Sequence, residues 1–185
     1  PVGYPVPLNL GSVDVIHSFW VPKLAGKTDM VPGEENYMWF EADVPGEYYG
    51  QCAEYCGTSH ANMKFKVIAV PENEFNAWLQ TQAASAFESS DALVQEGAGV
   101  FKSAGCTGCH ATKTVANKDS TGRVGPNLAH VASRRDLAAG MLSNANENGT
   151  VNDALLQENL RTWLQDPNEV KPGNLMSSGA QVYTD

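Results

Sequence analysis

The stretch 51–63 holds four side chains that bind soft metal ions: Cys52, Cys56, His60 and Met63. Together these residue types suit copper rather than magnesium or calcium. An upstream histidine, His17, supplies the further imidazole that a copper site uses. One copper ion needs only one thiolate, so two thiolates four residues apart favour two copper ions that share both sulfurs. Such a stretch must be held rigidly between secondary-structure elements, which constrains the fold.

Two other interpretations of this stretch are weaker. A disulfide between Cys52 and Cys56 is compatible with an oxidising compartment, but it leaves His60 and Met63 unexplained. A zinc site uses cysteine and histidine at short spacing, but methionine is not among its usual ligands. The order and softness of the side chains therefore favour copper.

A second motif, Cys106-Thr107-Gly108-Cys109-His110, has the pattern of covalent haem c attachment. The two thiols form thioethers with the haem, and the adjacent histidine lies where it can ligate the iron. The alternative is a thioredoxin-like redox pair, which needs a βαβ setting that this region lacks. With two cysteines in each motif, none of the four is left for a structural disulfide.

Residues 1–70 are predicted to form short strands. Val6, Leu8 and Leu10 alternate with other residues, a period of two that is typical of strands. Further segments rich in β-branched or aromatic residues are 13–19, 37–40, 47–51 and 64–70. Several short strands separated by proline and glycine turns predict a β-sandwich, with the ligand stretch between two adjacent strands.

From residue 71 onward the pattern changes to helices. Residues 71–82 are predicted to form a helix, because Pro71 suits the first turn and the apolar residues share one face. The small, polar stretch 81–90 marks a domain boundary. Ser90 is the expected cap of the next helix, in which Gly97 indicates close approach by another helix.

Two further features are predicted in the C-terminal half. Residues 151–164 carry an apolar stripe and are expected to form a helix that ends before Pro167. The polar stretch 111–123 is expected to be a loop.

Composition excludes some classes of function. The formal net charge is −9, which argues against nucleic acid as a partner and is compatible with steering of a basic protein. A merely solubilising acidic surface explains the charge equally well. No apolar run approaches the roughly 18 residues that cross a bilayer, and no signal peptide is visible.

The first motif and the segment 14–19 resemble the binuclear copper (CuA) loop of cytochrome c oxidase subunit II. The resemblance implies that Cys52 and Cys56 bridge two coppers, that His17 and His60 each bind one copper, and that Met63 is a weak ligand. It also implies that Glu54 binds copper through its backbone carbonyl. The Glu54 side chain would reach a magnesium ion (Mg2+) shared with subunit I.

The second motif resembles a class I cytochrome c. His130, Met141 and Met176 are all candidates for the second axial ligand of the iron. The segments 125–128 and 171–176 resemble the proline loop and the methionine loop of that family. The resemblance implies that Met176 is the axial ligand opposite His110, that His130 and Met141 are not ligands, and that the Pro126 carbonyl supports His110. Candidate partners of the haem propionates are Arg134, Arg135 and Trp163.

Taken together, the chain resembles subunit II of a bacterial cytochrome c oxidase with a fused cytochrome c domain. The implied domains are a partial CuA cupredoxin domain (1–71), a helix and linker (72–89) and a cytochrome c domain (90–185). The implied folds are an all-β, cupredoxin-like Greek-key sandwich and an all-α class I cytochrome c. We expect the sandwich to be incomplete at its N-terminus and the cytochrome to lack its C-terminal helix.

The implied function is electron relay. A donor reduces the haem, and the electron passes to the copper pair and then to haem a in subunit I, where oxygen is reduced and protons are pumped. No residue of this chain would be catalytic in the oxygen chemistry. The implied partners are subunit I, other oxidase subunits and a donor, which is a cytochrome c, a high-potential iron–sulfur protein or a quinol-oxidising complex. The implied location is the periplasmic side of a bacterial cell membrane, with anchoring by preceding helices.

Two alternatives have the same sites. One is a soluble electron carrier with a CuA centre and a haem, which predicts no membrane partner. The other is a nitrogen-oxide reductase subunit with the same copper site, in which the magnesium-facing role of Glu54 loses its purpose. A quinol oxidase subunit is disfavoured, because such relatives lose copper ligands that are all present here.

Overall fold

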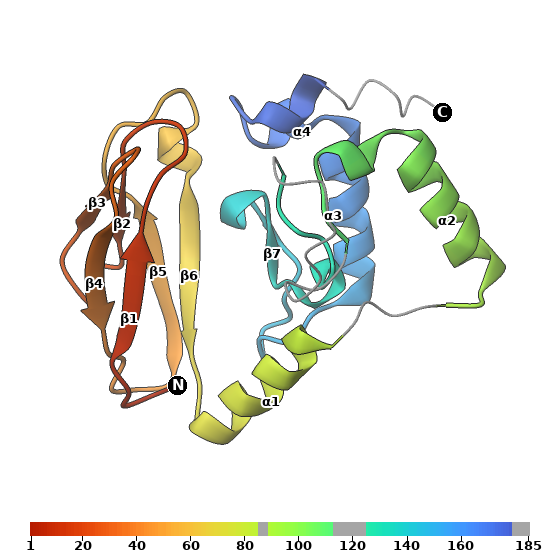
Figure 1. The fold of residues 1–185 in the computed structure, drawn as a ribbon. Helices are drawn as coiled ribbons and strands as arrows, with labels where there is room; N and C mark the ends of the chain where they lie inside the picture. The colour runs from red at the N-terminus through yellow and green to blue at the C-terminus, as the bar shows by residue number, and fades with distance from the viewer. Residues whose placement is uncertain (85–88, 113–124, 179–185) are drawn as a thin grey trace.

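The computed structural model of the chain describes residues 1–84, 89–112 and 125–178. The strands of the N-terminal part lie on one side, and most of the helices lie on the other (Figure 1). Strand β6 borders the helical part, and α1 leads from the sheets into it. No described helix is long and apolar enough to cross a membrane.

The N-terminal part contains two antiparallel sheets. Its strands are β1 (Val6–Leu10), β2 (His17–Trp20), β3 (Thr28–Met30), β4 (Asn36–Phe40), β5 (Gly46–Cys52) and β6 (Lys64–Ala69). Strands β1 and β4 pair with each other, and the second sheet has the order β3-β2-β5-β6. The predicted β-rich sandwich is therefore confirmed in residues 1–70.

A stack of aromatic rings joins the two sheets. The Phe19 ring of β2 lies 6.4 Å from the Phe40 ring of β4 and 4.7 Å from the Phe65 ring of β6, measured between centroids. Because Phe40 belongs to one sheet and the other two rings belong to the second, the stack forms the core of the sandwich. Leu10 and Val21 are also buried, with 6% and 1% of their surfaces exposed.

Gly50 makes room for this core. It pairs with Phe65 across β5 and β6, and a β-carbon on Gly50 would lie within 3.0 Å of the Phe65 ring. The phenylalanine ring therefore lies directly over the glycine backbone, where any side chain would displace it. Since β5 ends at Cys52, this packing lies next to the ligand stretch.

The strand predictions are accurate except in the second segment. Strands β1, β4, β5 and β6 match the predicted positions closely, whereas β3 was not predicted. The predicted strand 13–19 begins only at His17. Before it, the Ser12 hydroxyl bonds the Asp14 carboxylate and the Val15 carbonyl, so the backbone turns instead of pairing.

The helices of the second part are α1 (Glu72–Ala83), α2 (Ala92–Ser103), α3 (Asp153–Gln165) and α4 (Pro167–Val170). The predicted helices 71–82 and 151–164 are confirmed to within two residues at each end. Asp91, and not Ser90, caps α2, because its carboxylate accepts the backbone N–H groups of Leu93 and Val94. Among the described residues, no atom of another element lies within 4 Å of a β-carbon placed on Gly97, so the predicted close approach is not seen there.

Short elements complete the C-terminal part. Among the described residues these are the 3-10 turns η2 (Cys106–Gly108), η3 (Val131–Ser133), η4 (Ala138–Gly140) and η5 (Leu175–Ser178). A further 3-10 turn, η1 (His60–Asn62), lies in the sandwich between β5 and β6. Strands β7 (Asp136–Leu137) and β8 (Leu142–Ser143) form a small ladder that was not predicted. The predicted loop 111–123 lies almost entirely outside the described residues.

Candidate metal centre

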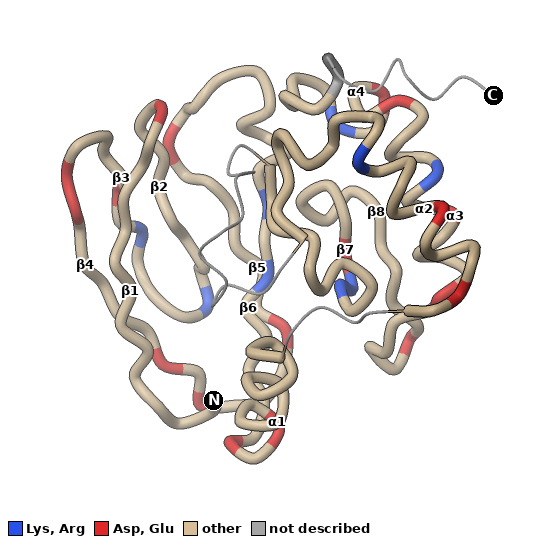
Figure 2. The backbone as a smooth tube through the Cα atoms, turned by 45° about the vertical axis from the view of Figure 1, so that its right-hand side comes forward, with Lys and Arg blue, Asp and Glu red and all other residues tan. Residues whose placement is uncertain are grey.

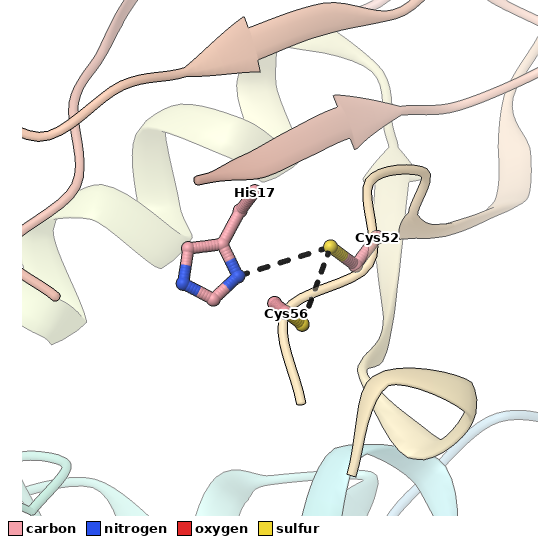
Figure 3. Close-up of side chains that lie close together, drawn as sticks. All are labelled: His17, Cys52 and Cys56. Carbon is pink, nitrogen blue, oxygen red and sulfur yellow. Dashed lines mark hydrogen bonds between the residues drawn. The ribbon is translucent and has the colours of Figure 1, made fainter. Parts of the chain in front are cut away.

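Three predicted copper ligands from two segments meet at one end of the sandwich. His17 begins β2, Cys52 ends β5, and Cys56 lies in the loop that follows (Figure 3). The Sγ atom of Cys52 lies 3.8 Å from the Nδ1 atom of His17 and 3.8 Å from the Sγ atom of Cys56. Their ligand atoms all lie within 4.8 Å of one another, as in a metal-binding cluster.

The other predicted copper residues complete this cluster. The Cys56 sulfur lies 3.6 Å from the Nδ1 atom of His60 and 3.9 Å from the Sδ atom of Met63. The Cys52 sulfur lies 3.2 Å from the backbone oxygen of Glu54. The structure therefore brings together all six residues that the sequence predicted at the copper site. The role of the Glu54 side chain toward magnesium stays a prediction.

Backbone hydrogen bonds hold the copper loop, defined as residues 52–63. The Cys52 N–H donates to the Met63 carbonyl, and the Ala53 N–H donates to the Ser18 carbonyl, each at 2.9 Å. The first bond closes the loop on itself, and the second ties it to β2. Cys52 is only 7% exposed, so one of the two sulfurs is largely shielded from water.

Asp14 fixes the ring of His17, a role that sequence reasoning missed. Its carboxylate lies 2.9 Å from Nε2, which leaves Nδ1 directed at the Cys52 sulfur. A carboxylate on the outer nitrogen sets the tautomer of a metal-binding histidine. The hydrogen bond from His17 is the main cause that lowers the pKa of Asp14 to about 2. The only available sequence signal was a carboxylate three residues before the histidine, a spacing that is common by chance.

The two thiols are electrostatically unequal. Burial opposes ionisation of Cys52, but hydrogen bonds from the backbone at Glu54 and Ser18 and from His17 outweigh it, so the pKa of Cys52 falls to about 6. Burial and the neighbouring Cys52 sulfur raise the pKa of Cys56. In the metal-free chain at neutral pH, a single negative charge is therefore favoured on this pair of sulfurs.

The haem-attachment motif lies in a 3-10 turn just after α2. Cys106 begins η2, and the His110 N–H donates to the Cys106 carbonyl at 2.9 Å. The Nδ1 atom of His110 lies 2.8 Å from the Pro126 carbonyl oxygen, the contact that the resemblance predicted. A β-carbon on Gly125 would overlap the His110 ring, so Gly125 allows the proline loop to approach the imidazole. This contact leaves Nε2 of His110 available for an iron.

Met176 is held by the side chains of Trp163, on α3, and of Asn174. The Trp163 indole N–H donates to the Met176 sulfur at 3.1 Å, so the structure places Trp163 at the predicted iron ligand. The Asn174 side-chain oxygen accepts the Met176 N–H at 2.9 Å, and its amide donates to the Lys171 carbonyl at 2.8 Å. Asn174 was therefore missed as the residue that shapes the Met loop, defined as residues 171–176.

The two arginines predicted at the propionates have protein partners. Arg134 donates to the backbone carbonyl of Asn127, and burial lowers its pKa. Arg135 donates to the Glu47 carboxylate on β5 at 3.1 Å. The Nε2 atom of His130, which was predicted not to be a ligand, lies 3.2 Å from the Gln82 carbonyl oxygen near the end of α1. The propionate roles of these arginines and of Trp163 stay predictions.

Comparison with known proteins relates the chain to a respiratory oxidase. Residues 1–70 match the model of the cytochrome c oxidase subunit II periplasmic domain. Cytochrome c oxidase subunit 2 of Alkalihalophilus pseudofirmus is 44% identical over 95% of this chain and 46% of that protein. The same subunit of Bacillus sp. (strain PS3) is 38% identical over 96% of this chain and 48% of that protein. The chain thus spans about half the length of these relatives.

A solved structure is also similar. The periplasmic domain of subunit II of cytochrome oxidase from Bradyrhizobium japonicum shares 40% identity, with a TM-score of 0.43 over 44% of this chain and 59% of that one. The sequence relatives are subunits of an oxidoreductase, cytochrome c oxidase. Residues 1–70 of this chain are therefore similar to the periplasmic domain of cytochrome c oxidase subunit II.

Proposed function

We propose that this chain is the electron-transfer part of subunit II of a bacterial haem-copper cytochrome c oxidase. It accepts electrons at a haem c held by Cys106, Cys109, His110 and Met176 and delivers them through a binuclear CuA site. From there they reach haem a in subunit I, where oxygen is reduced to water and protons are pumped. In this function, both sites lie on the periplasmic side of the cell membrane.

One observation carries the proposal: six residues from β2, β5 and the copper loop converge with their sulfurs side by side. The Sγ atoms of Cys52 and Cys56 lie 3.8 Å apart, much farther than the about 2.05 Å of a disulfide. Each sulfur also faces the Nδ1 atom of a different histidine. Two thiolates, two imidazoles and a thioether around a shared centre fit two soft copper ions.

Different residues of the chain would bind the copper ions and orient their ligands. Cys52, Cys56, His17, His60 and Met63 would hold the copper pair. When bound, the copper pair and the haem supply reversible one-electron redox chemistry. The chain itself shields Cys52 from water and orients His17 through Asp14, so little rearrangement accompanies the change of charge.

The His110 side of the haem site fits in the same way. The Pro126 carbonyl occupies the Nδ1 side of His110, which directs Nε2 toward an iron. A thioether such as that of Met176 raises the potential of the iron relative to a second histidine. The cytochrome c domain over residues 90–185 and the linker over 72–89 belong to this proposal, as does a magnesium ion at Glu54. The donor is a soluble redox protein or a docked quinol-oxidising complex, and the acceptor is subunit I.

The copper assignment is tested by metal content and electron paramagnetic resonance. We expect two coppers per chain and a mixed-valence signal shared by two copper nuclei. Cys52→Ser and Cys56→Ser each remove that signal, whereas Tyr55→Phe, in the same loop but 75% exposed, retains it. A single-copper blue signal in the unmodified chain contradicts the binuclear site.

The haem assignment is tested by absorption spectroscopy of the purified chain. We expect one covalently bound haem, and we expect Met176→Leu to abolish axial thioether ligation. Met141→Leu, a matched change at a residue that is 40% exposed, leaves the spectrum unchanged. The opposite pattern assigns the axial position to Met141 and overturns the Met176 assignment.

A further inference from the structure

The Met loop touches the copper loop. A β-carbon on Gly173 would lie 2.9 Å from Cβ and 3.0 Å from Cγ2 of Thr58, and 3.3 Å from the backbone nitrogen of Ser59. Figure 1 shows α4, which leads into the Met loop, at the same end of the molecule as the loop between β5 and β6. Along the chain, the contact is two residues from His60 and three residues from Met176.

Hydrogen bonds hold the backbone on both sides of the contact in place. Gly173 has a φ of +80° and donates its N–H to the Asn168 side chain at 3.2 Å, while Asn174 braces the rest of the loop. On the other side, the His60 N–H donates to the Gly57 carbonyl at 3.0 Å, which closes the turn that contains Thr58. Each loop therefore presents a fixed surface to the other.

A second contact holds the two parts of the chain together. Lys66 of β6 lies 3.2 Å from the Glu47 carboxylate of β5 and 2.8 Å from the Asp136 carboxylate of β7. Arg135 adds a bond to Glu47 at 3.1 Å. We call these four residues the charge cluster; their side chains are between 20% and 35% exposed. Figure 2 shows basic residues on β6 and beside β7, where the two parts of the chain face each other.

We propose that Gly173 and Thr58 form the contact through which an electron crosses from the Met loop to the copper loop, with Gly173 as a positioning residue. This inference rests on the proposed function. The transfer oxidises the haem iron by one electron and reduces the copper pair by one electron, and no bond or proton changes place. The charge cluster fixes the approach, so the transfer needs no diffusional encounter within the chain.

The physical reason is the steep distance dependence of electron tunnelling. A gap between bonded segments attenuates the transfer far more than the same length of covalent chain. With only hydrogen on the α-carbon of residue 173, the Gly173 backbone can lie directly against the Thr58 side chain. A side chain at residue 173 forces the loops apart, and loss of the Thr58 side chain opens a gap from the other side.

The contact itself is tested in the metal-free chain. We expect Gly173→Ala to shift the backbone amide resonances of Thr58, Ser59 and His60, because the added methyl meets Thr58. The control is Gly33→Ala, which has the same φ of +80° but nothing within 4 Å, and which leaves those resonances in place. Unchanged copper-loop resonances in Gly173→Ala overturn the contact.

The electron route is tested in the copper- and haem-loaded chain by flash reduction of the haem. We expect Thr58→Gly to slow haem-to-copper transfer several-fold while both spectra and both reduction potentials stay the same. Gly173→Ala in the Thr58→Gly background restores much of the rate, because its methyl refills the gap. Gly33→Ala, which lies outside both loops and meets nothing within 4 Å, is the control and leaves the rate unchanged.

The outcomes separate the two claims. If the loaded Thr58→Gly variant transfers electrons as fast as the unmodified protein, the electron route is overturned, but the proposed function is not. A chain that binds no copper or no haem overturns the proposed function and the route together, and the amide resonances still decide whether the loops touch.

Discussion

At the scale of single residues, the candidate copper site depends on how Asp14 orients the ring of His17 toward Cys52. His17 reaches the Cys52 sulfur through Nδ1 because Asp14 occupies Nε2. Burial alone lowers the pKa of His17, but the hydrogen bonds to Asp14 and Cys52 raise it above its usual value. Asp14 therefore fixes the orientation of the His17 ring without being a copper ligand itself.

We expect Asp14→Ala to weaken copper binding about 10- to 100-fold, the usual cost of removing the partner of a metal-binding histidine. The measurement is competition with a copper chelator at fixed pH. Asp43→Ala removes the same charge from an exposed turn and controls for the general electrostatic effect. Equal affinities for the two variants contradict a specific role for Asp14.

The ligand residues were predictable from sequence, and their supports were not. Cys52, Cys56, His60 and Met63 lie within twelve residues, so their chemistry and spacing are visible together. Asp14 and Asn174 are ordinary polar residues whose role appears only when a turn directs them at a ring or a loop. Their roles as supports depend on backbone direction, which residue type does not encode.

At the scale of elements, β5 and β6 carry the copper loop between them and must stay in register. Gly50 lies opposite Phe65, whose ring also stacks on Phe19 in the core. The alternating pattern was enough to place both strands, because period two is a local property. The cap of α2 was misplaced by one residue because Ser90 and Asp91 are both good caps, and only the structure selects between them.

We expect Gly50→Ala to destabilise the chain by about 1–3 kcal/mol, since the new methyl collides with the Phe65 ring. Thermal unfolding measures the change. Gly11→Ala is the matched control, because its β-carbon meets its nearest atom at an ordinary 3.6 Å. Phe65→Leu in the Gly50→Ala background recovers part of the loss, and an equal effect of the two glycine substitutions contradicts the steric explanation.

At the scale of the whole molecule, the charge cluster joins residues far apart in the sequence. Arg135 and Glu47 are separated by 88 residues. No periodicity predicts such a pair, so the sequence indicated two parts but not how they are arranged. For the same reason the contact between the Met loop and the copper loop was not predicted.

The cluster gives stability a defined pH window. Hydrogen bonds from Lys66 and Arg135 outweigh burial and lower the pKa of Glu47 below 4.5. Its contribution is therefore full above pH 4.5 and is lost as the pH falls through the lowered value. Hydrogen bonds to Asp136 and Glu47 outweigh burial and raise the pKa of Lys66 above 10.5, so its contribution is full below that pH and is lost as the pH rises through the raised value.

We expect Glu47→Gln to be less stable than the unmodified chain at neutral pH, with the difference shrinking as the pH falls below 4.5. Thermal unfolding at a series of pH values measures this convergence. Glu34→Gln, at an exposed position, is the control for loss of one negative charge. A stability difference that persists unchanged in acid contradicts the linkage to Glu47.

The order in which such a chain is matured follows from where its cysteines lie. Under the proposed function, the exposed Cys109 thiol is open to haem attachment in the folded chain. Cys52 is buried, and the loop that follows it leans on Gly173. Under the proposed function, copper delivery to both sulfurs is therefore expected before this loop closes, which makes the timing of folding part of the biosynthesis of the protein.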